Sequence, residues 1–99
     1  MQSFYPPGFD REMGCTEREW LMWLPGAVRD QPLALGTAEA GVDIEGGRLR
    51  LTWQLLAPRQ IALMRMPRLA VQFRFDGVSD DARQRFMRYF DLYMQRGGG

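Results

Sequence analysis

VDIEGGRLRLTW, residues 42–53, is the stretch of sequence that decides the fold class. Apolar and polar residues alternate along it on both sides of Gly46 and Gly47, which is typical of strands with one buried face. Two such segments joined by two glycines predict a β-hairpin with a tight turn. The chain is therefore expected to contain an antiparallel sheet with one face that must be covered.

Placing Gly46 and Gly47 in the turn also predicts the register of this hairpin. On the apolar face the facing pairs would be Ile44–Leu49, Val42–Leu51 and Ala40–Trp53. On the polar face two pairs of opposite charge would meet, Glu45–Arg48 and Asp43–Arg50. Each exposed pair of this kind contributes only ~0.2–1 kcal/mol.

Two further strands are expected after the hairpin. Residues 69–75 alternate apolar and polar side chains and predict a half-buried strand. Residues 60–66 are expected to form a separate strand between Pro58 and Pro67, because proline lacks the N–H that a central ladder needs. Their pattern leaves two interpretations open, a strand buried on both faces or one with a bulge near Pro67. Together with the hairpin they make an antiparallel meander of four strands.

A short helix is predicted before the sheet. Thr16 and Glu19 have the spacing of a capping box, in which each side chain satisfies a backbone N–H of the other residue. Cys15 and Trp20 occupy the flanking positions of a hydrophobic staple, which gives the single thiol a packing role. Pro25, followed by a glycine, is expected to end this helix.

A longer helix is predicted at the C-terminal end, opened by Ser79 as the cap and by Asp80 and Asp81 in the first turn. Its apolar stripe comprises Ala82, Phe86, Tyr89, Phe90 and Tyr93, with Met87 and Met94 on the flank. The opposite, polar side comprises Gln84, Arg88, Asp91 and Gln95. The predicted fold class is α+β: a short N-terminal helix, a four-stranded antiparallel meander, and a C-terminal amphipathic helix packed on one sheet face.

The length of 99 residues suits one small domain, residues 1–99. Residues 1–14 are expected to form an extended arm, and residues 97–99, all glycine, a flexible tail. The aromatic rings of the arm are expected to lie against the domain's own core, and the alternative is a docking segment for a partner.

The composition excludes several kinds of catalytic site. All 13 basic residues are arginine, there is no histidine, and Cys15 is the one cysteine. Histidine bases, lysine Schiff bases and cysteine cages for metals are therefore absent, and we expect no catalytic residue, no cofactor and no metal. We expect a protein that is not an enzyme. Without an apolar run of ~20 residues or a basic leader, it is expected to be cytoplasmic and away from membranes, and its arginine usage suits a bacterial, high-GC genome.

The charge is unevenly distributed, with 3 arginines against 8 acidic residues in 1–47 and 10 against 4 in 48–99. The first hypothesis is a protein-interaction or self-associating domain, whose partner would be an unknown protein or a second copy in a homodimer. The alternative is nucleic-acid or polyanion binding by the arginines of the C-terminal half. A third hypothesis is a small-ligand pocket between sheet and helix, where Tyr89, Tyr93 or an arginine would hold a carboxylate. The candidate interaction residues are Phe4, Tyr5, Phe9, Arg65, Arg68, Arg74, Arg85 and Arg88.

Overall fold

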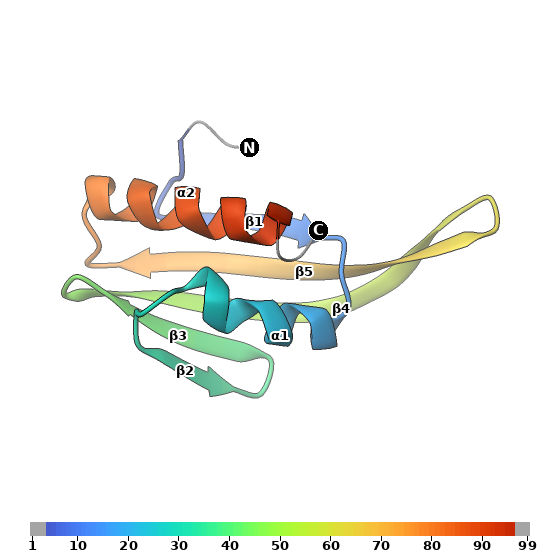
Figure 1. Cartoon of the computed structure of the whole chain (residues 1–99), viewed down its shortest axis with the longest axis horizontal. Helices are drawn as coiled ribbons and strands as arrows, with labels where there is room; N and C mark the ends of the chain where they lie inside the picture. Colours follow the sequence, from blue (N-terminus) through green and yellow to red (C-terminus); the bar gives the residue numbers. More distant parts are fainter. Residues whose placement is uncertain (1–3, 97–99) are drawn as a thin grey trace.

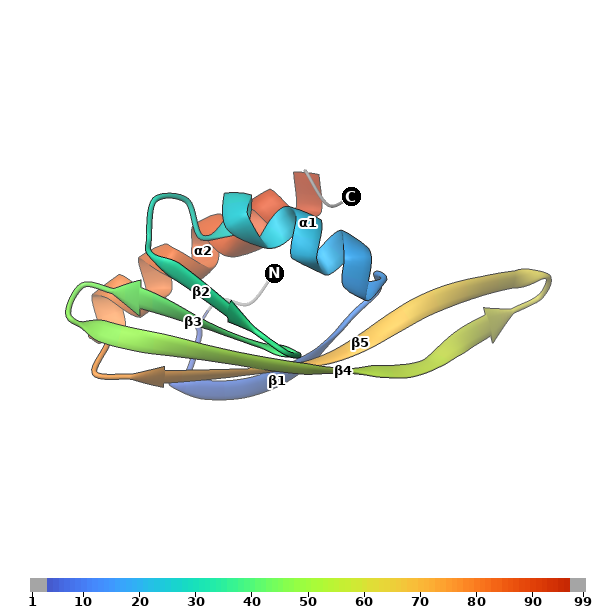
Figure 2. The same cartoon turned by 90° about the horizontal axis from the view of Figure 1, so that it is seen from below.

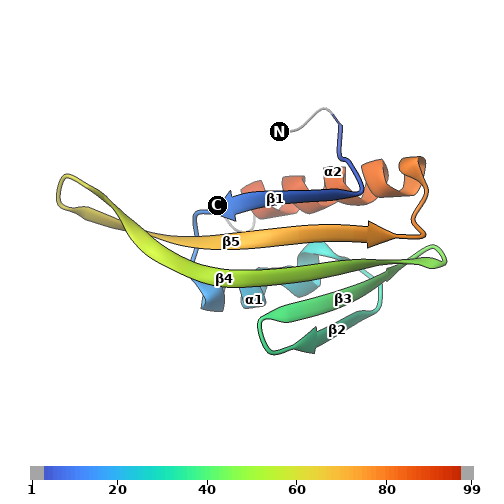
Figure 3. The same ribbon diagram turned by 180° about the vertical axis from the view of Figure 1, so that it is seen from behind.

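Two helices cover one face of a five-stranded antiparallel sheet in a computed structural model of the chain, which describes residues 4–96 (Figures 1 and 2). The strand order is β1-β5-β4-β3-β2, and the other face of the sheet is open (Figure 3). The elements in chain order are β1 (Gly8–Met13), α1 (Glu17–Ala27), β2 (Leu33–Gly36), β3 (Glu39–Ile44), β4 (Gly47–Ile61), β5 (Met64–Asp76) and α2 (Asp80–Arg96). The expected tail 97–99 lies outside the described residues.

The α+β class is confirmed, but the sheet has five strands rather than four, and they differ from the predicted meander. Residues 8–13 of the expected arm form β1, which pairs with β5 from Gly8 opposite Arg74 to Met13 opposite Leu69. Strand β2 has only four residues and pairs with β3 at the other edge. Neither edge strand has a clear alternating pattern of its own, because each is specified by its partner in the sheet.

Residues 60–66 do not form a separate strand. Strand β4 continues to Ile61, the chain turns, and β5 runs back from Met64. Leu56 lies opposite Arg68 and Arg59 lies opposite Met66, so Ala57 and Pro58 together oppose Pro67. This is a β-bulge, the place where a ladder tolerates proline. The bulge interpretation is confirmed, and burial on both faces is wrong because residues 60–66 are all exposed.

The β3–β4 hairpin exists, but its predicted register is wrong by two residues. The turn residues are Glu45 (φ 44°) and Gly46 (φ 85°), the two positive values that a type I′ turn requires. Gly47 belongs to the ladder opposite Ile44, and a Cβ there would overlap the carbonyl group of Gly77. The apolar faces are preserved, since a shift of two residues leaves a period of two unchanged. Neither predicted charge pair faces across the ladder: Arg48 lies opposite Asp43, and Arg50 lies opposite Gly41.

Helix α1 begins as predicted and continues past its proline. The backbone N–H of Glu19 donates to the Thr16 hydroxyl at 3.1 Å, and the N–H of Thr16 donates to the Glu19 carboxylate at 2.9 Å. The helix extends to Ala27 with Pro25 in its last turn, so the prediction that Pro25 and Gly26 end the helix is wrong. Only three helical residues, 25–27, remain from the proline onward, which limits how far its missing N–H disturbs the helix. The indole N–H of Trp53 donates to Glu17 at 2.8 Å and ties the sheet to the start of α1.

Helix α2 buries a face that overlaps the predicted stripe at Ala82 and Phe90 but is rotated toward its flank. Met87, Phe90 and Met94 are buried, whereas Phe86 is only partly so. Asp91, expected on the solvent side, is also buried. The rotation arises because α2 packs against the N-terminal segment as well as the sheet. The core shared by both helices and the sheet includes Trp20, Leu24, Leu49, Leu51, Leu69, Val71, Phe73, Met87 and Phe90.

Candidate functional site

The most conspicuous feature is a two-stranded projection, residues 55–68 (Figures 1 and 2). From here on we call this projection the arm; it is distinct from the N-terminal segment 1–14. Strand β3 pairs with β4 only as far as Thr52, and β1 pairs with β5 only from Leu69 onward. Between those points β4 and β5 have only each other as neighbours, so both edges of the arm are open. The molecule is consequently long, 46 × 30 × 22 Å.

The arm exposes a run of large apolar side chains. Leu63 at its tip is 98% exposed, Leu55 68% and Met64 64%. With Ile61 and Met66, the arm holds five of the ten exposed large hydrophobic residues in 4–96. Ile61 lies opposite Met64 in the ladder, and Met66 shares the face of Met64, so three of the five gather on one face of the arm. Exposed apolar side chains that gather in this way often mark an interaction site.

The two ends of the long axis carry opposite charge. The arm has three arginines, Arg59, Arg65 and Arg68, and no acidic residue. Glu12 at its base forms ion pairs with Arg68 at 3.3 Å and with Arg59 at 3.8 Å, while Arg65 has no ion pair within residues 4–96. At the opposite end, where β3 and β5 finish and α2 begins, the exposed acidic residues are Asp43, Glu45, Asp76, Asp80 and Asp81. Glu45 pairs there with Arg85 and Asp80 with Arg83, and Arg48 lies opposite Asp43 and Asp76, which leaves a smaller net negative charge.

A buried polar cluster joins the N-terminal segment to α2. Asp91 accepts a hydrogen bond from the Tyr5 hydroxyl at 2.6 Å and from Arg11 at 2.6 Å. Arg83, which is 3% exposed, donates to the backbone carbonyl of Tyr5 at 2.7 Å. Burial, aided by the hydrogen bond to Asp91 and by its charge, raises the pKa of Tyr5 to about 12. The cluster is a structural clamp whose polar groups already bond one another.

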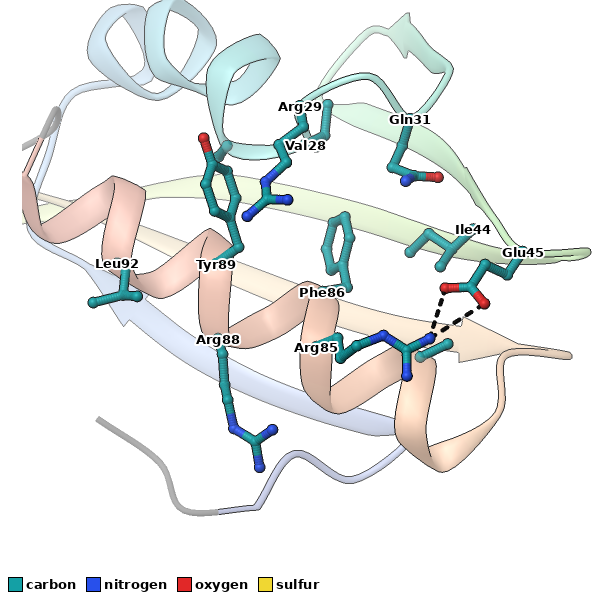
Figure 4. A pocket seen from close by; sticks show the side chains of 12 residues that line it. Val28, Arg29, Gln31, Ile44, Glu45, Arg85, Phe86, Arg88, Tyr89 and Leu92 are labelled. Carbon is teal, nitrogen blue, oxygen red and sulfur yellow. Dashed lines mark hydrogen bonds and ion pairs between the residues drawn. The ribbon is translucent and has the colours of Figure 1, made fainter.

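A pocket of about 500 Å³ lies between α2, the end of α1 and the β3–β4 turn (Figure 4). Phe86 and Ile44 project into it from opposite sides. The guanidinium carbon of Arg29 lies 3.5 Å from the centre of the Tyr89 ring. Arg85 donates to both carboxylate oxygens of Glu45, at 3.0 and 3.3 Å. The other lining residues are Ala27, Val28, Gln31, Ala82, Arg88 and Leu92.

The aromatic candidates predicted from the sequence occupy different environments. Phe4 is 57% exposed, whereas Tyr5 is fully buried. Phe9 stacks on Phe73 with ring centres 4.6 Å apart. The expectation that rings of the N-terminal segment lie against the core is therefore confirmed for Tyr5 and Phe9.

The arginine candidates fall into three groups. Arg65 and Arg68 lie on the arm, and Arg74 lies on the open sheet face, paired with Asp10 at 2.9 Å. Arg85 and Arg88 line the pocket. The ion pairs of Arg68 and Arg74 reduce the positive charge that a polyanion would meet, and polyanion binding stays a prediction. Sequence reasoning missed Arg29 and Glu45 as pocket residues, because they come from a helix end and a turn that only the fold brings together.

Cys15 is buried beside α1, as the staple predicts. Burial raises the pKa of its thiol, and the charge of Glu19 adds to the effect, so the reactive thiolate is disfavoured. Within residues 4–96 no group of three or more cysteine, aspartate and glutamate side chains could hold a metal ion. No helix in the same range is long and apolar enough to span a membrane. Comparisons with protein-family models, curated proteins and solved structures find no match for this chain.

Proposed function

We propose that this protein is a non-catalytic, self-associating domain whose arm binds a second copy of the chain. The supporting observation is the exposed apolar surface of the arm, with Leu63, Leu55 and Met64 each at least 64% exposed. An isolated two-stranded hairpin is marginally stable in water, and its open edges can pair with another strand. A partner that covers the arm would stabilise the hairpin and pair its open edges.

The burial available at the arm is large enough to support association. Removing an exposed leucine or methionine side chain from water contributes about 1.5–3 kcal/mol. Leu55, Ile61, Leu63, Met64 and Met66 together offer several such contributions. The ordering of the arm and the loss of independent motion oppose them.

Charge complementarity favours a second copy in antiparallel orientation. Arg65 on the arm has no ion pair within residues 4–96, and neither has Asp81 at the other end of the molecule, where Asp76 is exposed as well. Two antiparallel copies place each basic arm near the acidic end of the other, and the arrangement closes as a two-fold dimer. The pocket is a poor receptor for the arm, because Arg29 and Arg85 in its lining would repel Arg65.

Sedimentation equilibrium over a range of concentrations tests self-association. The wild type is expected to form dimers, and Leu63→Glu combined with Met64→Glu should weaken dimerisation by about 100-fold or more, because two charges would have to be buried. Both side chains project into solvent in the single chain, so the monomer should remain folded. Met22→Glu is the matched control, since Met22 is 65% exposed but lies on α1, and it should leave dimerisation unchanged.

A charge exchange tests the orientation. Arg65→Glu and Asp81→Arg should each weaken self-association at low salt, and an equimolar mixture of the two variants should restore it. A wild type that remains monomeric up to about 1 mM would contradict self-association. If the wild type dimerises and the Leu63→Glu, Met64→Glu protein dimerises with the same affinity, the arm is not the interface.

A further inference from the structure

The pocket beside α2 is independent of the arm and lies toward the other end of the molecule. The part-exposed Phe86 ring contributes carbon surface to its floor, and the almost fully buried Ile44 and Val28 lie beneath and beside it (Figure 4). Its volume of about 500 Å³ falls within the ~300–1,000 Å³ typical of small-molecule sites. A concave apolar floor with a few polar groups at the rim is the usual form of such a site.

Two guanidinium groups stand at the rim of this floor. Arg29 lies over the Tyr89 ring, and no carboxylate pairs with it within residues 4–96. Arg85 bonds Glu45 and keeps further N–H groups, since a guanidinium has five. Arg88 extends away from Phe86 in Figure 4 and adds positive charge at the edge. Three arginines against Glu45 leave the lining with net positive charge.

The backbone of Arg29 is unusual for its residue type. Arg29 follows the cap of α1 with φ 57°, a left-handed conformation in which glycine is favoured at the end of a helix. Arginine at that position costs about 1 kcal/mol or more relative to glycine. The conformation aims the side chain across Tyr89, where it meets the pocket.

We propose that this pocket binds a small aromatic carboxylate. The ring would lie on Phe86, and the carboxylate would accept hydrogen bonds from Arg29 and Arg85, the geometry for which a planar guanidinium is suited. Inorganic phosphate is a poorer fit, because it cannot use the apolar floor. This site goes beyond the proposed self-association and does not depend on it.

Titration with benzoate, followed by amide NMR shifts, tests the site. Benzoate should shift amides around Val28, Glu45 and Phe86 in a saturable manner. Benzamide, the uncharged analogue, and acetate, which lacks the ring, should each bind at least about tenfold more weakly. The same titration on the Leu63→Glu, Met64→Glu protein separates this result from any effect of dimerisation.

Substitutions at the rim distinguish the site from general attraction of anions. Arg29→Gln and Arg85→Gln should each weaken benzoate binding about tenfold, and Arg18→Gln, an exposed arginine on α1, should not change it. Glu45→Gln should strengthen binding, because it removes the carboxylate that competes for Arg85. The proposal is overturned if benzoate shifts no pocket amide, if benzamide or acetate binds equally well, or if Arg18→Gln weakens binding as much as Arg29→Gln.

Discussion

The Tyr5 hydroxyl donates a 2.6 Å hydrogen bond to Asp91, across 86 residues of sequence. The same carboxylate pairs with Arg11 at 2.6 Å, on the strand that closes one edge of the sheet. Gln84 accepts from the Tyr5 backbone N–H at 2.9 Å and donates to its carbonyl at 2.8 Å. The N-terminal segment is thereby joined to α2 by buried polar contacts rather than by apolar packing alone.

Replacing Asp91 with alanine should lower the free energy of unfolding by about 3–5 kcal/mol, because the buried Tyr5 hydroxyl would lose its acceptor and the ion pair with Arg11 would be broken. Urea denaturation measures the change. Asp10→Ala is the matched control: it also removes the carboxylate partner of an arginine, but the Asp10–Arg74 pair is exposed and should contribute less than about 1 kcal/mol. Equal losses of unfolding free energy in the two variants would contradict the special contribution of the buried Tyr5–Asp91–Arg11 cluster.

The pKa of Tyr5 predicts a loss of stability at high pH. In the unfolded chain the phenol titrates near 10, and in the folded protein burial and the contact with Asp91 raise its pKa to about 12. The unfolded state therefore loses its proton first, and stability should fall as pH rises from about 10 to 12, by at most about 1.4 kcal/mol per pH unit from this group. Denaturation of the wild type and Tyr5→Phe across that range isolates the effect, since Cys15 titrates in both proteins. Parallel pH profiles would count against it.

Gly47 and Gly46 should respond differently to alanine. A Cβ at Gly47 would overlap the Gly77 carbonyl group and lie 2.7 Å from the carbonyl oxygen of Asp76, and both are backbone atoms that cannot swing aside. Gly47→Ala should cost about 3 kcal/mol, at the upper end for overpacking. Gly46→Ala meets no atom within 4 Å and should cost only about 1–2 kcal/mol for its positive φ.

Gly14→Ala is the control for both glycines, because a Cβ there meets nothing within 4 Å. It should be neutral or slightly stabilising through its effect on the unfolded chain. Thermal denaturation of the three variants should give Gly47→Ala the lowest melting temperature. If Gly46→Ala were instead the more damaging change, the close approach of β4 to the β5–α2 connection would be refuted.

Gly26 should tolerate alanine only when Tyr93 is removed. Alanine inside a helix normally stabilises it by about 1 kcal/mol relative to glycine, yet a Cβ at Gly26 would overlap the Tyr93 hydroxyl and approach its Cε2 at 2.8 Å. Gly26→Ala should therefore destabilise the wild type by about 1–3 kcal/mol. In a Tyr93→Ala background the same change should become neutral or stabilising. A double-mutant cycle measures the difference, and a coupling energy near zero would show that α1 and α2 do not meet there.

Local rules explain why some elements could be predicted from the sequence. The capping box of Thr16 and Glu19 depends only on residues three apart, and both of its hydrogen bonds form. The apolar faces of β3 and β4 follow from alternation, which survives a change of register. The register itself could not be predicted, because the residue that excludes a Cβ at Gly47 is Gly77, thirty positions later.

Alternation also could not locate the arm. Pro58 and Pro67 each indicate an interruption, and treating them separately divides the chain into short strands. In the structure they oppose each other within one bulge, so β4 and β5 stay continuous and project beyond the sheet. The partners of a proline in a ladder are set by pairing across the sheet, which the local sequence does not contain.

The sequence by itself determined the α+β class, the helix starts, the apolar faces of the sheet and the absence of histidine and lysine chemistry, because these follow from residue type and short-range periodicity. Only the tertiary structure decided the edge strands, the face that α2 buries and the separation of basic arm from acidic end. It alone brought Arg29 and Glu45 into one pocket. Each of these depends on contacts between residues far apart in the chain, where burial and close approach override local preference.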